Sequence, residues 1–352
     1  MYRRVQEKVA GYGLDAYLAA REENVNWLCQ KENYYPPGVI LITAQQTYLF
    51  TPSRNISGFR ALYPEYQVLP GALPQAVAFC RRQSVKTLGY ESNALSADSR
   101  QTLRQSLPQT ELRALPDFIE DLRMIKTADE VEKLQAAAAV SDRAFLAFLK
   151  RLRPGQTERE ARNILQNLLM EMGADGLSFE ILLSSGARCY LPHAVPTEKR
   201  LEKGDFVLVD FGVRVNGYCS DTTRTVCLGK ADALQKQRYE LVRRAQESAV
   251  ERIRAGMSGK EADALARDII SAAEPAGCYD YGLGHGIGML VHEKPRLGPA
   301  ADFILQANTA VSVEPGFYLP GWGGIRIEDI IVVKEHGRNL VMSKLSRELI
   351  EL

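Results

Sequence analysis

The first third of the chain alternates between helical and strand-like spacing of apolar side chains. Residues 2–12 have the spacing of an amphipathic helix. Two short apolar runs, Val39–Ile42 and Thr47–Phe50, are separated by a polar segment and predict two strands joined by a turn. Such alternation is typical of an α/β domain.

The pattern changes after residue 121. A stretch rich in alanine and leucine predicts a long helix from Asp129 to about Arg151. A chain of 352 residues is also long for a single hydrophobic core. We therefore expect an N-terminal domain of residues 1–121 and a C-terminal domain of residues 122–352.

The C-terminal domain contains an internal repeat of three features. Each half has a capping box that begins a helix, then a histidine with a proline three residues later, then an apolar strand that ends in an acid and a glycine. In chain order these are Thr157 with Glu160, His193 with Pro196 and Phe206–Gly212, and then Ser258 with Glu261, His292 with Pro295 and Ala310–Gly316. The repeat predicts two similar halves related by a pseudo-twofold axis, with their acids meeting near it.

A hairpin brings two aspartates together in the first half. Asn216 and Gly217 are typical of a two-residue turn, which would place Val215 opposite Tyr218. In the same register Gly212 faces Asp221, so Asp210 and Asp221 lie diagonally on one face of the sheet. Two buried carboxylates repel each other strongly unless one is protonated or a cation lies between them.

The second half adds two glutamates and an imidazole. Glu314 ends one strand, and Gly324–Val332 predicts another, with Arg326 and Glu328 on the same face. His285 lies among glycines that allow close backbone approach. Four carboxylates balance two divalent cations, and oxygen ligands with one imidazole suit Mn²⁺, Co²⁺ or Zn²⁺. Strand-end acids paired with arginines would explain neither the hairpin nor the repeat.

Composition excludes several other classes of protein. The net charge of +1 offers no field for nucleic acid, and no apolar run is long enough to span a membrane. The six cysteines form no regular framework, which is typical of reduced thiols. The N-terminal segment has no sustained apolar stretch of the kind found in secretory signals, so we expect a cytoplasmic protein. The glycines at 282–288 do not open into a helix that could seat a phosphate, which argues against nucleotide binding.

The motifs resemble those of the pita-bread metallopeptidases, and in particular the Xaa-Pro dipeptidase (prolidase) and aminopeptidase P branch. The resemblance covers nearly the whole chain. It rests on these segments: Arg21–Leu28, Leu122–Val131, Gly284–Gly288 with Val291–Pro295, and Gly324–Asp329. It implies an α/β creatinase-like N-terminal domain followed by an α+β pita-bread catalytic domain.

The resemblance also implies roles for the acidic residues and the histidine. Asp221 and Glu328 would bridge two divalent ions, Mn²⁺ or Co²⁺ before Zn²⁺. Asp210 would bind one ion, and His285 and Glu314 the other. A homodimer is expected, in which the loop 29–37 could reach a partner's active site. Lys31 and Glu32 on this loop are better interpreted as charges exposed to solvent.

The expected reaction is hydrolysis of small proline-containing peptides. Glu314 would act as general base, and His193 and His292 would donate hydrogen bonds to the carbonyl oxygen or hold the substrate. Arg296 and Arg326 are candidates for binding a terminal carboxylate, and Arg326 could equally orient the carboxylates beside it. Xaa-Pro dipeptides are the expected substrates. The alternatives are an aminopeptidase P that acts on longer Xaa-Pro-Yaa peptides, a non-peptidase metal-dependent relative, and a binding module that has lost its chemistry.

Overall fold

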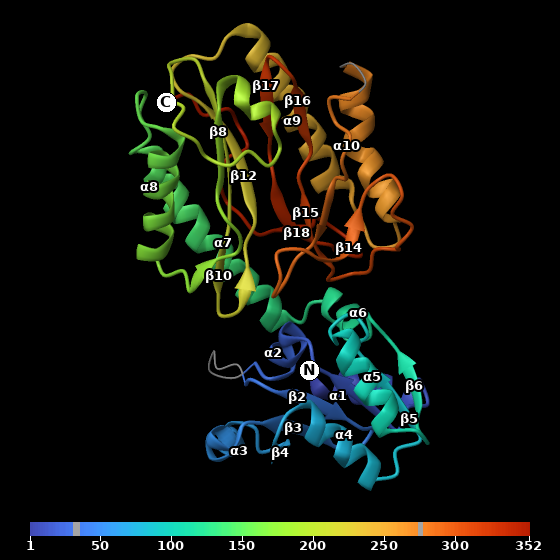
Figure 1. Ribbon diagram of the computed structural model, residues 1–352. Helices are drawn as coiled ribbons and strands as arrows, with labels where there is room; N and C mark the ends of the chain where they lie inside the picture. The colour runs from blue at the N-terminus through green and yellow to red at the C-terminus, as the bar shows by residue number, and fades with distance from the viewer. Residues whose placement is uncertain (31–35, 274–276) are drawn as a thin grey trace. The chain divides into compact units, whose positions relative to one another are not determined.

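The computed structural model describes residues 1–30, 36–273 and 277–352, which form two compact units, Met1–Arg123 and Met124–Leu352 (Figure 1). Lys31 and Glu32 lie outside the described residues. All six cysteines are buried thiols, as the sequence predicts. Within the described ranges, every helix is too short or too polar to cross a membrane.

The first unit is built on a six-stranded mixed sheet in the order β4-β3-β2-β1-β5-β6. The predicted strand pair is confirmed as β2 and β3, which pair antiparallel. Every residue of β1 and β2 is buried, which explains why the sequences of these strands are continuous apolar runs. The strands are β1 Ala16–Ala19, β2 Val39–Ile42, β3 Thr47–Thr51, β4 Gln67–Pro70, β5 Thr87–Tyr90 and β6 Glu111–Ala114. The helices are α1 Tyr2–Gly11, α2 Glu22–Leu28, the 3₁₀ turn Ser53–Asn55, α3 Ile56–Leu62, α4 Leu73–Arg82, α5 Ala97–Ser106 and α6 Glu120–Met124.

The second unit contains two helix pairs packed on antiparallel strands. The predicted long helix is confirmed as α7, which begins one residue earlier and ends two residues earlier than expected. The helices are α7 Ala128–Leu149, α8 Glu158–Glu171, the 3₁₀ turn Gly186–Tyr190, α9 Ala233–Arg252 and α10 Gly259–Ala273. The strands are β7 Gly176–Leu177, β8 Leu182–Ser185, β9 Phe206–Phe211, β10 Val213–Val215, β11 Tyr218–Cys219, β12 Thr222–Cys227, β13 Gly284–Gly286, β14 Glu293–Leu297, β15 Ala310–Val313, β16 Gly316–Leu319, β17 Gly323–Arg326, β18 Asp329–Val332 and β19 Leu340–Val341.

The two halves of this unit repeat one arrangement. Apolar residues of α7 and α8 pack on β8, β9 and β12, whereas those of α9 and α10 pack on β15 and β18 (Figure 1). Both capping boxes form, with Glu160 N–H donating to Thr157 Oγ1 and Glu261 N–H to Ser258 Oγ. Strand order matches as well, since β9 lies between β8 and β12, and β15 lies between β13 and β18.

Corresponding backbone hydrogen bonds reinforce the repeat. In the first half Gly155 N–H donates to Leu201 O at 2.8 Å, and in the second Gly256 N–H donates to Leu305 O at the same distance. Each bond ties the segment before a capping box to the segment before an acid-bearing strand. The expected pseudo-twofold is therefore present in the backbone as well as in the sequence.

The prediction of one strand from Gly324 to Val332 is wrong. The segment divides into β17, which pairs with β16, and β18, which pairs with β15. Glu328 lies at the break, and its N–H donates to Thr223 O of β12. Both strands are fully buried, so the apolar pattern of the sequence continues from β17 into β18 although the two strands belong to different sheets.

Candidate metal centre

The hairpin after β9 sets the relative positions of two aspartates. Val215 pairs with Tyr218 as predicted, and Asp210 pairs with Thr223 in the same register. Asp221 therefore lies diagonally next to Asp210 on one face. Both carboxylates are almost fully buried, at 8% and 5% exposure.

Arg326 of β17 holds one oxygen of Asp210. Its Nη2 donates to Asp210 Oδ2 at 2.5 Å, and its other donors bond to Thr223 Oγ1, Tyr318 Oη and Pro192 O. Burial raises the pKa of Asp210, and the nearby Glu314 adds to the rise, whereas Arg326 opposes it. Because its bonds are made within the protein, Arg326 is placed to orient Asp210 better than to bind a substrate.

His285 extends from β13 toward the acids. Its Nδ1 lies 3.1 Å from the acceptor Gly286 O, and donation from Nδ1 to this oxygen would leave Nε2 as the nitrogen that can bind a metal ion. That Nε2 lies 3.1 Å from Glu314 Oε1 and 3.6 Å from Asp221 Oδ2. Ser312 Oγ fixes both partners, since it accepts from His285 N–H and donates to Glu314 Oε1.

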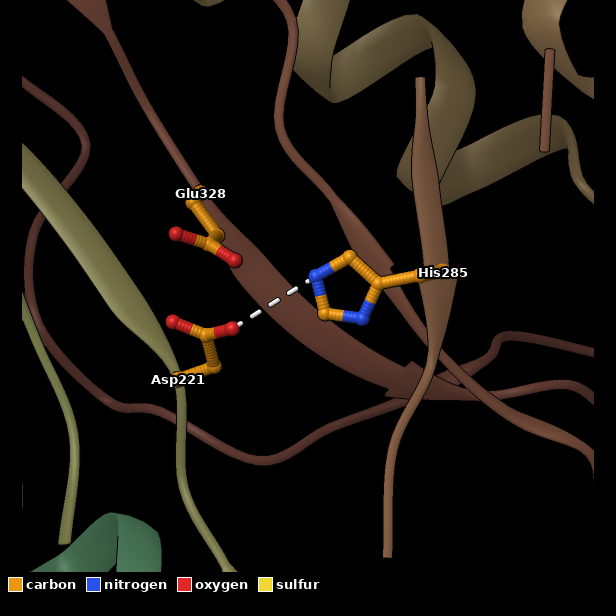
Figure 2. Close-up of side chains that lie close together, drawn as sticks. All are labelled: Asp221, His285 and Glu328. Atoms are coloured by element: carbon orange, nitrogen blue, oxygen red, sulfur yellow. Dashed lines mark ion pairs between the residues drawn. The ribbon is translucent and has the colours of Figure 1, made fainter. Parts of the chain in front are cut away.

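Three of the predicted ligands converge most tightly. Figure 2 shows Asp221, His285 and Glu328 pointing toward one another, and one ligand atom from each lies within 4.8 Å of the other two. Burial raises the pKa of Asp221 well above its usual range, and the carboxylate of Glu328 raises it further. The pKa of Glu328 is likewise raised well above its usual range, by burial and then by Glu314.

Carboxylate oxygens without hydrogen-bond partners indicate whether divalent ions fit this cluster. Asp210 Oδ1 and Glu328 Oε1 are buried and have no hydrogen-bond partner among the described residues. A buried carboxylate oxygen without a partner is costly unless a proton or a cation binds it. The remaining oxygen of Glu328 accepts from Thr223 Oγ1 at 2.6 Å, which orients the carboxylate. The donor set, with its orphaned oxygens and the lone pair of His285, fits hard to borderline divalent ions.

The other predicted site residues surround the cluster. A cavity of about 240 Å³ is lined by all five predicted ligands together with His193, His292 and Arg326. A wider cavity of about 560 Å³ shares His193, His285, His292 and Glu314 with it and also reaches Arg296. The rings of His285 and His292 lie edge to face, with centroids 4.3 Å apart. Every predicted site residue therefore lines one of these two connected spaces.

Three supporting residues were missed by the sequence reasoning. Thr223 joins Glu328 to Arg326, and Ser312 joins His285 to Glu314. Each lies two residues from a proposed ligand on its own chain segment, so alternation along a strand could have found both. Arg224 had no such signal. Its guanidinium is buried in an ion pair with Asp329 at 2.8 Å and donates to the backbone oxygens of Thr223 and Glu328.

Sequence comparison matches both parts of the chain to known families. Residues 132–335 match the model of metallopeptidase family M24, and residues 2–125 match the creatinase/prolidase N-terminal domain. The chain belongs to metallopeptidase family M24. The M24 chain is 32% identical to the Xaa-Pro dipeptidase of Pyrococcus horikoshii, over 99% of this chain and 98% of that protein.

Solved structures of M24 proteins agree with the sequence match. An Xaa-Pro dipeptidase from Bacillus anthracis is similar with a TM-score of 0.94 and 35% identity, over 100% of this chain and 99% of that one. An X-Pro aminopeptidase from Thermotoga maritima has a TM-score of 0.88 and 30% identity, over 98% and 100% of the two chains. These neighbours confirm the expected pita-bread fold. The protein is a metallopeptidase, and its family implies that the carboxylate and histidine cluster holds divalent metal.

Proposed function

We propose that this M24 peptidase hydrolyses Xaa-Pro dipeptides with two divalent ions held by Asp210, Asp221, His285, Glu314 and Glu328. The convergence of these five side chains on one cavity, with two carboxylate oxygens unused by the protein, carries the proposal. The Xaa-Pro dipeptidases among its relatives, at 32–38% identity, support the substrate. Mn²⁺ or Co²⁺ is the proposed ion, with Zn²⁺ as the alternative.

The chain's own residues divide the remaining work. Bound divalent ions lower the pKa of water and polarise a carbonyl group. Glu314 accepts the proton of the attacking water and returns it to the proline nitrogen that leaves. His193 and His292 line both cavities, and there they donate hydrogen bonds to the carbonyl oxygen of the substrate.

Arg296 favours a substrate that ends at proline. It is exposed on β14, pairs with His285 across the strand ladder and lines the wider cavity. A guanidinium binds a carboxylate with two parallel hydrogen bonds, so the terminal carboxylate of a dipeptide is the matching group.

Substrate length tests the proposal directly. The chelated protein is reloaded with Mn²⁺, Co²⁺ or Zn²⁺ and assayed on Ala-Pro, Ala-Pro amide and Ala-Pro-Ala. The dipeptide should be cleaved best, and Arg296→Gln should reduce its advantage over the amide. Full activity in chelated protein would contradict the metal mechanism.

An X-Pro aminopeptidase is the second candidate. The structure of the Thermotoga protein matches this chain over nearly its full length, and the wider cavity, with a volume of about 560 Å³, leaves room for a longer peptide. Faster cleavage of the tripeptide than of the dipeptide would favour this activity.

Three further proposals rest on the sequence and on the family resemblance. We propose a homodimer, a cytoplasmic location and a domain boundary after residue 121. Sedimentation of the purified protein tests the first, and expression of residues 122–352 as a separate domain tests the last.

A further inference from the structure

Each of the two cavities that share His193, His285, His292 and Glu314 has an exposed charged side chain outside the proposed ligand set. Arg296 lines the wider cavity, and Glu180 lines the narrower one. Both side chains are exposed, and neither makes an ion pair with a described residue. The proposed catalytic residues Glu314, His193 and His292 line both cavities and thus lie between the two charges.

Glu180 is placed by the strand that follows it. It lies two residues before Leu182, which opens β8 and pairs with Asp210 of β9. Leu182 and Glu180 both line the narrower cavity, as does Phe179. The carboxylate therefore lies beside Phe179 and Leu182 at the wall of the chamber that the proposed metal ligands also line.

Charge balance makes Glu180 distinct from the other acids there. The four carboxylates of the proposed ligands are offset by two divalent ions, and Arg326 adds a further positive charge. Among the described residues that line this chamber, Glu180 is the one carboxylate outside the ligand set. Without it, the chamber would carry one net positive charge and repel a cation, and Glu180 neutralises that charge.

We infer that Glu180 binds the α-ammonium group of the substrate. The inference rests on the proposed peptidase function and deepens it. A dipeptide carries an ammonium group at one end and a carboxylate at the other. With Glu180 in the narrower cavity and Arg296 in the wider one, the site accepts the dipeptide in one direction, with its scissile bond beside the His193, His292 and Glu314 side chains that line both cavities.

Glu180→Gln tests this contact with little risk to folding, because the side chain is exposed. Loss of one charge-assisted hydrogen bond at an exposed site should raise the KM for Ala-Pro roughly 5- to 10-fold, with kcat changed less. N-propionylproline lacks the ammonium group but is otherwise the same size. As a competitive inhibitor it should bind the variant and the wild type equally well.

Two controls separate the possible outcomes. Glu171→Gln removes an exposed carboxylate at the end of α8 and should leave KM unchanged. A Glu180→Gln variant with wild-type KM for Ala-Pro would overturn the inference and leave the dipeptidase proposal standing. Equal weakening of Ala-Pro and N-propionylproline would also overturn it, because the effect would then be independent of the ammonium group. A wild-type protein that cleaves no Xaa-Pro substrate would instead remove the proposed function, and the inference with it.

Discussion

Replacing Glu328 with glutamine removes one of two buried carboxylates that face each other across the metal centre. Its ligand atom and that of Asp221 lie within 4.8 Å. At that distance and an effective dielectric constant of about 20, two negative charges repel by about 3.5 kcal/mol. The glutamine keeps an oxygen that can still accept the bond from Thr223 Oγ1. We therefore expect Glu328→Gln to stabilise the metal-free protein at pH values where both carboxylates of the wild type are charged, while it weakens metal binding.

The direction of the pH effect follows from the raised pKa of Glu328. The folded protein keeps this proton at pH values where the unfolded chain has released it. The resulting stability is present at low pH and is lost as the pH rises through the raised pKa of the folded state. Metal-free wild-type protein should thus become less stable as the pH rises above the ordinary range of a glutamate, and Glu328→Gln should change less.

Thermal unfolding with and without metal measures both effects. In chelated protein at pH 8, the Tm of Glu328→Gln should exceed that of the wild type by about 5–10 °C. With Mn²⁺ added, the order should reverse, because the wild type gains more stability from binding. Glu171→Gln is the matched control and should follow the wild type in both conditions. A metal-free variant less stable than the metal-free wild type would refute the reasoning.

The remaining predictions concern the histidines and a buried arginine. His193→Ala and His292→Ala should keep the wild-type metal content and lower kcat roughly a hundredfold to a thousandfold, whereas His285→Ala should lose metal. Equal metal loss in His292→Ala and His285→Ala, measured by atomic emission, would show that His292 is a ligand. Arg224→Met breaks a buried ion pair and should lower the free energy of unfolding in urea by about 3–5 kcal/mol, whereas Arg151→Met, at an exposed site, should not. An unchanged free energy of unfolding in Arg224→Met would show that this ion pair does not stabilise the fold.

Local sequence patterns predicted the parts of the site that depend on neighbouring residues. The turn at Asn216 and Gly217 fixes the register of its own hairpin, so the positions of Asp210 and Asp221 followed from a few residues. The capping boxes at Thr157 and Ser258 are equally local. In each case the atoms that decide the structure lie within one short segment.

The errors arose where distant segments decide the structure. The break at Glu328 depends on distant strands, because β17 before it pairs with β16, β18 after it pairs with β15, and Glu328 N–H itself donates to Thr223 O of β12. Arg326 shares a strand-like pattern with Glu328, but its partners are Asp210, Tyr318 and Pro192, which no local pattern connects to it. The sequence therefore left its role open, whereas the contacts favour an orienting role.

The repeat also explains why a symmetric backbone carries an asymmetric site. Asp210 pairs with Leu182 in the first half, and Glu314 N–H bonds to Leu283 O at the matching place in the second. Two residues farther along, the first half has Ser184 where the second has His285. Both halves supply carboxylates, but one alone supplies an imidazole, so the two proposed ion positions differ in chemistry. Ser312 Oγ bonds both to the backbone N–H of His285 and to the carboxylate of Glu314. The strands of the second half therefore hold the imidazole and this carboxylate together, and this produces the asymmetry.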